Sequence, residues 1–297
     1  MSALQDSMNL IRTRAKGFTI NFENFSVVSG TIFGDWDSVF SGRGIDLEEV
    51  REFRSGDRIE DINPVLSAKR RKPMVIDRVE TREVKILVIY DFSRSIVEIR
   101  DKILTSFAAA SIIIHSALSH NIPSGFWGVS GSHEVVQFPG VGEEHYINTI
   151  DLMQNVIYDF EKSRTKRLTL EGWRELLPPD SLVFIISDFL GKDSFFRKLL
   201  ENRFSVYKVV PVVVQDELEY TFPSINSRGI TIPGTDVSSH RGVKLISTKK
   251  ACEKMRRENE KRFEELRKTF EDRGLKYAHI PKLDFTAIRE EIQKTIR

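Results

Sequence analysis

The chain has 297 residues and a mass of 34.2 kDa, with 40% hydrophobic and 30% charged residues, which is enough for the core of one large or two modest domains and excludes disorder as the main state. Lys and Arg total 45 against 43 Asp and Glu, so the formal charge of +2 creates no global field that would attract nucleic acid or an anionic membrane, and we expect no nucleic-acid partner. The single cysteine, Cys252, excludes an internal disulfide framework and a cysteine-rich zinc module, so we expect a cytoplasmic protein.

The first residues contain no uninterrupted apolar run of the kind found in a signal peptide. The most apolar long segment, residues 103–118, is shorter than the roughly 18 apolar residues of a spanning helix and contains serines and a histidine. We therefore predict a buried helix there and no transmembrane segment.

Residues 1–80 are irregular in pattern. A short helix is predicted from Leu4 to Lys16, alternating apolar residues follow in 18–30, and the pairs Gly56-Asp57 and Asn63-Pro64 indicate turns. We predict a smaller, β-rich N-terminal region over residues 1–80.

From Val84 onward, apolar strands alternate with helical patterns. Strands are predicted at 84–90, 125–130, 133–138, 182–187, 206–214 and 275–280, and helices at 102–119, 143–160, 192–203, 249–273 and 285–296, with a β-rich excursion over 229–247. This order predicts an α/β domain over residues 81–297, built on a doubly wound, mostly parallel sheet with helices on both faces. The apolar stripe of helix 249–273 is expected to pack on that sheet rather than form a coiled coil.

Aspartates follow two of the buried strands. Asp91 opens the segment DFSRS, with Ser93 and Ser95 at alternating positions, and Asp188 follows strand 182–187. Because ligands bind outside the carboxyl ends of the strands in such sheets, these oxygen-bearing side chains are expected to converge on a hard cation, Mg²⁺ or Mn²⁺. The structural alternative is that Asp91 and Ser93 only cap the following helix.

This constellation resembles the metal-ion-dependent adhesion site of von Willebrand factor A domains. The resemblance implies that Ser93 and Ser95 bind the metal directly and that Asp91 and Asp188 act through water. A threonine completes such sites; Thr165 is the candidate, and Thr169 is its competitor.

The segment before the first strand is similar to that of a bacterial family called domain of unknown function 58. The similarity spans roughly residues 40–215, with Asn63 and Lys69 departing from the family's usual tryptophan and arginine, and its matching positions are Gly42, Arg43, Val50, Arg51, Phe53, Gly56, Asp57, Ile62, Ser67 and Ala68. The resemblance implies a non-enzymatic, metal-dependent protein-binding module that accepts an acidic side chain and works as an adaptor or chaperone-like partner of a MoxR-type AAA+ ATPase. The residues assigned to partner binding are Arg94, Arg43, Arg51, Asp57 and Arg58.

Two other interpretations remain open. A metal-dependent phosphoester hydrolase would use Asp91 as its nucleophile, but the haloacid dehalogenase pattern requires a second acid where Ser93 stands. Alternatively, the A-like domain binds partners without metal, with the Arg94 guanidinium either folded over the carboxylates or directed outward toward an acidic partner.

Overall fold

The computed structural model describes residues 2–22, 48–54, 57–78, 84–130, 133–158, 181–190, 207–221, 230–235, 242–247 and 249–296, together with residues 177 and 196. The chain divides into two compact units. The first comprises residues 1–22 and 84–297, and the second comprises residues 23–83.

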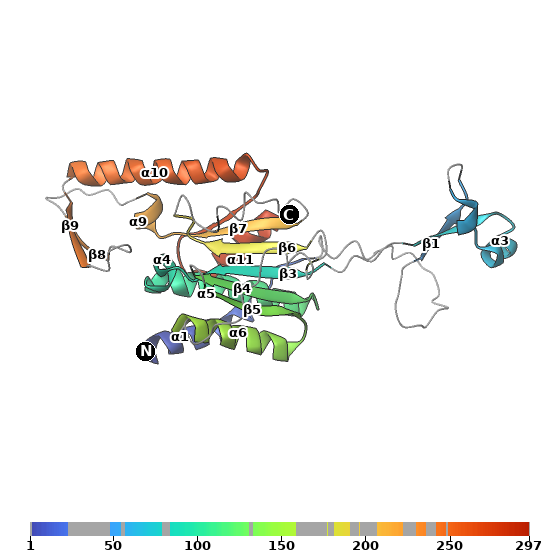
Figure 1. The fold of residues 1–297 in the computed structure, drawn as a ribbon, viewed down its shortest axis with the longest axis horizontal. Coiled ribbons are helices and arrows are strands. Elements are labelled where there is room, and N and C mark those ends of the chain that lie inside the picture. Colours follow the sequence, from blue (N-terminus) through green and yellow to red (C-terminus); the bar gives the residue numbers. More distant parts are fainter. Residues whose placement is uncertain are drawn as a thin grey trace. The chain divides into compact units, whose positions relative to one another are not determined.

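A six-stranded sheet forms the centre of the first unit (Figure 1). The strand order is β10-β7-β6-β3-β4-β5, and every neighbouring pair is parallel except β4 and β5. The strands are β3 (Ile86–Asp91), β4 (Ser124–Ser130), β5 (His133–Gly140), β6 (Leu182–Ser187), β7 (Lys208–Val214) and β10 (Ala278–Ile280). This arrangement confirms the predicted doubly wound, mostly parallel sheet.

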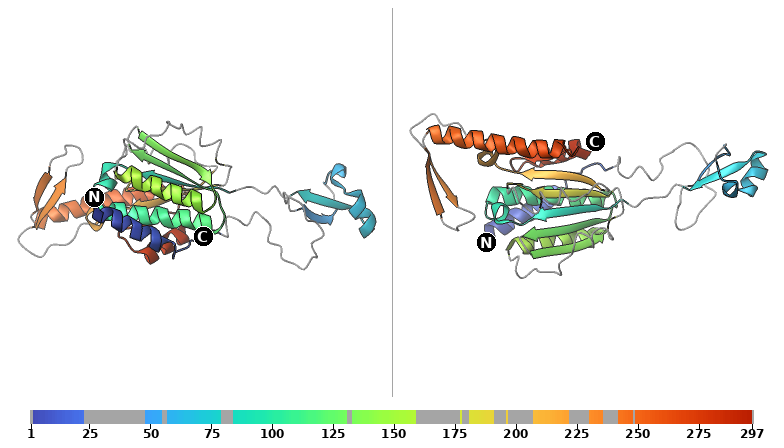
Figure 2. Two further views of the ribbon diagram at one scale, coloured as in Figure 1. Left: turned by 90° about the horizontal axis from the view of Figure 1, so that it is seen from below. Right: turned by 45° about the horizontal axis from the view of Figure 1, so that its top comes forward.

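Helices cover both faces of this sheet, as Figures 1 and 2 show. One face is covered by a layer of α1 (Ser2–Ala15), α5 (Arg100–Ser119), α6 (Glu143–Tyr158) and α11 (Phe285–Ile296). The other face packs against α10 (Lys249–Glu271), whose Leu266 and Phe270 join a buried cluster with Leu87 and Ile89 of β3. The expected packing of the α10 stripe on its own sheet is therefore observed.

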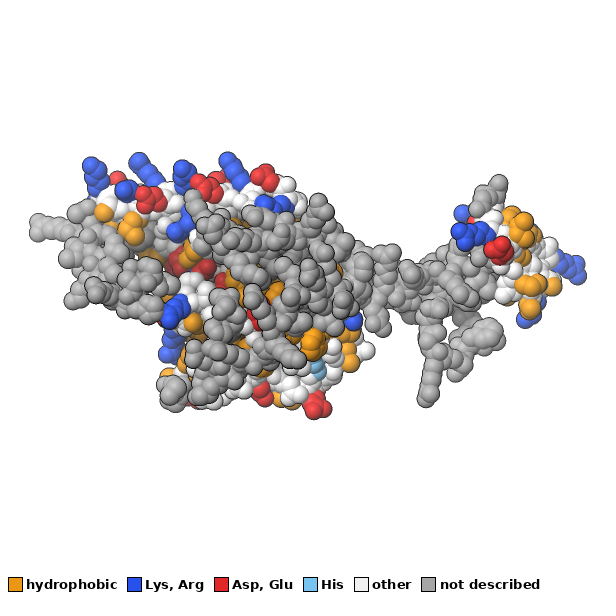
Figure 3. All heavy atoms as spheres, viewed as in Figure 1, with side chains coloured by type: hydrophobic (Ala, Val, Ile, Leu, Met, Phe, Trp, Pro, Cys, Tyr) orange, Lys and Arg blue, Asp and Glu red, His pale blue; other side chains and the backbone are white. Residues whose placement is uncertain are grey.

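The opposite, outer surface of α10 carries Lys and Arg side chains interspersed with Glu (Figure 3). Several of these side chains pair along the helix, as Lys254 does with Glu258 and Arg267 with Glu264. The helix ends before Gly274, whose φ of +66° is readily adopted only by glycine, and Leu275 N–H donates to the Phe270 carbonyl at 2.9 Å.

The helix α5 is buried almost all round. By length and composition alone it could cross a membrane, but 83% of its most apolar 18-residue window is buried inside the fold. A helix that is apolar on every side needs neighbours on every side, and α5 has them in the sheet, α1, α6 and α11.

Residues 2–22 belong to the sheet unit, although the sequence led us to group them with an N-terminal region extending to residue 80. Met8, Ile11 and Ala15 recur at helical spacing on one face of α1 and are buried in its contact with α5. Beyond α1, the backbone N–H of Asn21 donates to Gln293 of α11 at 2.7 Å, and Gln293 donates to the Asn21 carbonyl at 3.0 Å. Burial of an amphipathic face thus decides which unit this segment joins.

The second unit contains a two-stranded antiparallel sheet of β1 (Glu48–Glu52) and β2 (Met74–Arg78), with η1 (Ile59–Asp61) and α3 (Pro64–Arg70) between them. The predicted turn at Asn63-Pro64 is the start of α3. The Asn63 side chain accepts from the N–H groups of Val65 and Leu66, and Pro64 occupies the first helical turn.

Two short helices and one strand pair complete the described structure. The helices are α4 (Arg94–Val97) and α9 (Glu217–Tyr220), and the antiparallel pair is β8 (Ile230–Thr235) and β9 (Gly242–Ser247). Of the predicted helix 192–203, only residue 196 is among the described residues.

Candidate functional site at the strand ends

The two predicted aspartates meet where the strand order reverses. Asp91 is the last residue of β3, and Asp188 directly follows β6, the parallel neighbour of β3. The chain leaves β3 toward β4 on one side of this point and leaves β6 toward β7 on the other. In open α/β sheets ligands bind at the carboxyl ends of the strands beside such a reversal, so the sheet topology favours a site here.

Asp91 is almost completely buried, with 3% of its surface exposed. The backbone N–H of Ser93 donates to its Oδ1 at 2.8 Å, and the Ser187 hydroxyl donates to its Oδ2 at 2.6 Å. Burial raises the pKa of Asp91 to about 6; the Ser187 hydrogen bond opposes this shift, while the negative charge of Asp188 adds to it. Asp91 is therefore a buried carboxyl group, each oxygen of which accepts a hydrogen bond.

Ser93 and Ser95 lie at the entry to α4, and their hydroxyl oxygens are 3.0 Å apart. Ser93 occupies the N-cap position, yet its side chain makes no capping hydrogen bond to the helix. The capping alternative therefore fails for the Ser93 hydroxyl, which instead converges with that of Ser95 beside Asp91.

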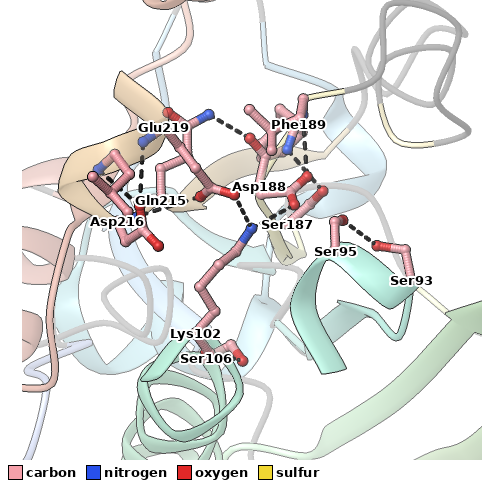
Figure 4. A network of polar contacts seen from close by, with 12 residues as sticks. Ser93, Ser95, Lys102, Ser106, Ser187, Asp188, Phe189, Gln215, Asp216 and Glu219 are labelled. Atoms are coloured by element: carbon pink, nitrogen blue, oxygen red, sulfur yellow. Dashed lines mark hydrogen bonds and ion pairs between the residues drawn. The ribbon is translucent and has the colours of Figure 1, made fainter. Parts of the chain in front are cut away.

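Asp188 is paired with a lysine. The ammonium group of Lys102, from α5, donates to Asp188 Oδ2 at 2.7 Å and to Glu219 Oε1 at 2.8 Å. The side-chain exposures are 1% for Lys102 and 5% for Asp188, so this ion pair is inside the protein. In Figure 4 the Lys102 side chain extends from α5 with its ammonium between Asp188 and Glu219, while Ser93 and Ser95 lie on the far side of Asp188.

Glu219 is held from both ends of its carboxylate. Its Oε2 accepts from the backbone N–H of Asp216 at 3.2 Å, and the Asp216 side chain accepts from Glu219 N–H, which closes a capping box on α9. Burial raises the pKa of Glu219 despite the adjacent Lys102 ammonium.

The backbone is strained directly after Asp188. Phe189, the next residue, has a φ of 51°, in the left-handed region that non-glycine residues seldom adopt, and its N–H donates to the Ser187 hydroxyl at 3.1 Å. Gln215, at the end of β7, donates to the Asp188 carbonyl at 2.5 Å, and Leu190 N–H donates to Asp188 Oδ1 at 3.1 Å. The surrounding structure thus fixes both the backbone and the side chain of Asp188.

Arg94 points away from the carboxylates. It is half exposed and lies 4.0 Å from Glu98, one turn further along. The hypothesis that its guanidinium folds over the aspartates is therefore wrong, because α4 directs Arg94 outward and a different cation, Lys102, neutralises Asp188. The two candidate threonines, Thr165 and Thr169, and the candidate Arg43 lie outside the described residues.

The remaining residues assigned to partner binding belong to the second unit. Arg51 and Asp57 form a two-bond ion pair, with distances of 2.7 and 2.8 Å, and the backbone N–H of Arg54 also donates to Asp57. The hydrogen bond from Arg51 lowers the pKa of Asp57 to about 2. The ion pair therefore joins β1 to Asp57, while Arg58 is exposed.

Sequence reasoning missed Lys102, Ser187 and Glu219. Lys102 directly precedes the apolar segment 103–118, and a charged residue at the start of an otherwise buried helix was the available signal. Glu219 could have been found from the capping-box spacing in Asp216-Glu217-Leu218-Glu219.

The oxygen donors present fit a hard divalent cation on the serine side of the site. Two hydroxyls converge there, with a buried carboxyl group behind them, and Mg²⁺ prefers oxygen ligands. Within the described ranges no group of three or more His, Cys, Asp and Glu side chains is placed to hold a metal ion. Asp188 already has a cation beside it, the ammonium group of Lys102.

Comparison with known proteins gives one family. The family model described as "Protein of unknown function DUF58" matches residues 49–265, and this description assigns no activity. No curated protein matches the chain. Among solved structures, "Crystal structure of conserved hypothetical protein BatB from Bacteroides thetaiotaomicron" matches at 14% identity and a TM-score of 0.38, covering 71% of this chain and 98% of that chain.

Proposed function

Because the chain belongs to the DUF58 family, we propose, from that premise and the geometry of its strand ends, that it is a non-enzymatic protein-binding module. Its contact point is the strand-end site, and its partner offers an acidic side chain. The observation that carries the proposal is the convergence of the Ser93 and Ser95 hydroxyls beside two buried aspartates at the reversal of the sheet.

In this proposal Ser93 and Ser95 hold Mg²⁺ or Mn²⁺ directly, with Asp91 and Asp188 behind them and Thr165 or Thr169 as the further ligand. When bound, the metal supplies an open coordination position for a partner's carboxylate. The protein's own residues fix the hydroxyls in place: Asp91 accepts from Ser93 N–H, and Ser187 holds the other oxygen of Asp91.

The proposed partner is a MoxR-type AAA+ ATPase in the cytoplasm. Arg94 is half exposed next to Ser93 and is suited to meet acidic residues that surround the partner's carboxylate. Arg58 offers a further exposed positive charge on the second unit.

A hydrolase is less well supported by the geometry. A nucleophilic carboxylate must present an oxygen to the substrate, whereas Asp91 is buried and each of its oxygens already accepts a hydrogen bond. Turnover of p-nitrophenyl phosphate that is lost in Asp91→Asn would overturn the non-enzymatic proposal.

The first test is calorimetric titration of the full chain with MgCl₂ and with MnCl₂. We expect binding by the wild-type protein and by Ser119→Ala, a control whose exposed hydroxyl only bonds the His115 carbonyl on α5. We expect loss of binding in Ser93→Ala with an unchanged circular dichroism spectrum. Equal metal binding in Ser93→Ala and wild type would contradict the assigned ligands.

The second test is a pull-down with the MoxR-type ATPase of the same genome. Capture in Mg²⁺, loss in EDTA and loss in Ser93→Ala are expected. Capture that is indifferent to both EDTA and Ser93→Ala would remove the metal from the proposed function.

A further inference from the structure

The Lys102 ammonium is the buried charge that the proposed metal site does not use. It donates to carboxylates from two different segments, Asp188 after β6 and Glu219 on α9. Its side chain is 1% exposed, so bulk water has little access to the ammonium, and the two carboxylates supply its hydrogen bonds.

We propose that Lys102 is the resident cation of the strand-end site, and that it competes with a divalent metal for Asp188 and so sets the metal affinity. This inference rests on the proposed function, because it concerns the same metal. It makes Lys102 a positioning residue, one that acts through Asp188 rather than on a ligand.

The competition follows from charge and distance. Each oxygen of Asp188 already accepts a hydrogen bond, Oδ1 from Leu190 N–H and Oδ2 from Lys102 at 2.7 Å. A doubly charged ion beside the same carboxylate repels an ammonium held that close, and burial leaves little solvent to screen the repulsion. A metal that uses Asp188 must therefore weaken the hold of Lys102 on it.

A chain of contacts runs from Lys102 through α9 to α10. Lys102 holds Glu219 of α9, the Arg262 guanidinium donates to the Glu219 carbonyl at 2.8 Å, and the Asn259 side chain donates to the Leu218 carbonyl at 2.6 Å. Displacement of Lys102 by a metal is expected to loosen the hold of α5 on α9, which is measurable as faster hydrogen exchange in residues 217–221.

The test is the variant Lys102→Met, with Lys294→Met as the matched control. Lys294 also forms an ion pair, with Glu291, but on the exposed surface of α11. By calorimetry we expect Lys102→Met to bind Mg²⁺ at least about tenfold more tightly than wild type, and Lys294→Met to match wild type. In EDTA, Lys102→Met is expected to melt at a lower temperature, because Asp188 and Glu219 lose their counter-charge, and Mg²⁺ should restore more of its stability than it adds to wild type.

The direction of the affinity change separates competition from damage, since a distorted site binds metal more weakly. Wild-type binding with an unchanged or weakened affinity in a folded Lys102→Met would overturn this inference and leave the proposed function intact. Binding by Lys102→Met but not by wild type would support it in its strongest form. No binding by either protein would overturn this inference together with the metal-dependent function.

A measurement on the wild-type protein covers the case in which Lys102→Met does not fold. The buried ammonium of Lys102 is protected from exchange with water, so its ¹H–¹⁵N signal is expected to be visible by NMR in ¹⁵N-lysine-labelled protein. We expect this signal to shift or vanish as Mg²⁺ saturates the site, while the backbone ¹H–¹⁵N signal of Lys294, on the exposed surface of α11, stays unchanged. A Lys102 signal that does not move at saturation would overturn the inference.

Discussion

Arg94 and Lys102 have different partners, although both belong to the segments that follow Asp91. Arg94 follows Ser93 directly in sequence, but α4 directs it outward to Glu98. Lys102 is eleven positions after Asp91, and α5 brings its ammonium to 2.7 Å from Asp188. At the scale of single residues, the direction that a helix gives a side chain decides its partner more than proximity in sequence does.

Gly128 of β4 allows the ring of Phe92 to pack close to the β4 backbone, beside the strand-end site. A Cβ atom at this position would lie 2.5 Å from Cε2 of Phe92, the residue that follows Asp91, and the Phe92 ring is itself packed against Tyr90 and Phe126. We expect Gly128→Ala to lower the free energy of unfolding by about 1–3 kcal/mol through overpacking, as measured by urea denaturation.

The control for this prediction is Gly17→Ala, where the nearest atom to an added Cβ is the Arg14 carbonyl oxygen at 3.4 Å. Its stability is expected to stay within about 0.5 kcal/mol of wild type. Equal effects of the two substitutions would show that the Phe92 contact does not limit the size of residue 128.

His279 of β10 is a second single-residue feature with a measurable consequence. Its ring contacts Tyr220 and Phe263, and among the described residues its buried Nε2 atom has no hydrogen-bond partner. Burial lowers the pKa of His279, and the charge of Glu291 only partly opposes the shift. The folded state therefore binds a proton less readily than the unfolded state, and stability is lost as the pH falls below the unfolded value of about 6.5.

We predict that His279→Phe, which keeps an aromatic ring but does not titrate, reduces the loss in melting temperature between about pH 7.5 and about pH 5.5. His115, whose pKa burial also lowers, is present in both proteins, so the difference between them reports on His279. An identical pH dependence in the two proteins would contradict the prediction.

Among the elements, α10 is rich in charged residues, yet a few buried side chains pack it against the sheet. Its buried residues are Cys252, Leu266 and Phe270, and Phe270 contacts Phe189, the strained residue after Asp188, with ring centroids 5.5 Å apart. The apolar stripe of α10 could be predicted from the sequence because its apolar residues recur with the period of a helix. The contact between Phe270 and Phe189 could not, because it joins residues far apart in the chain.

Truncation of the Phe270 side chain is expected to destabilise the protein. Phe270→Ala should lower the free energy of unfolding by about 3–5 kcal/mol, because it leaves a cavity against β3 and Phe189. Lys268→Ala, an exposed position on the same helix, should change it by less than about 0.5 kcal/mol. Chemical denaturation followed by circular dichroism measures both, and a loss below about 1 kcal/mol for Phe270→Ala would contradict the packing of α10 on the sheet.

At the scale of the whole molecule, the first 22 residues and the last helix belong to one folded unit. Phe18 stacks on Phe285, and Phe22 is fully buried in ring contact with His120 and Phe184. Residues 23–83, a separate compact unit, are thus inserted between two parts of the sheet unit.

Because residues 1–22 belong to the same unit as the sheet, a destabilising substitution in this N-terminal segment is expected to destabilise the sheet. We expect Phe22→Ala to destabilise the sheet unit by about 3–5 kcal/mol, and Leu10→Ala, an exposed position on α1, to be nearly neutral. Trp127, buried in β4, reports on this unit by fluorescence when the other two tryptophans, Trp36 and Trp173, are replaced by phenylalanine. Equal unfolding curves for the two variants would contradict the inclusion of residues 2–22 in the sheet unit.

The doubly wound sheet and the meeting of its strand-end oxygen donors at one edge could be predicted from the sequence alone; these donors are Asp91, Ser93, Ser95 and Asp188. Strand and helix periods are local, and once the strands are parallel their carboxyl ends must share an edge. By contrast, the folded structure was needed to show that residues 2–22 join the sheet unit and that Lys102 holds Asp188 and Glu219. These contacts join residues 272, 86 and 117 positions apart, and their partners are selected by burial and side-chain direction, which no local pattern records.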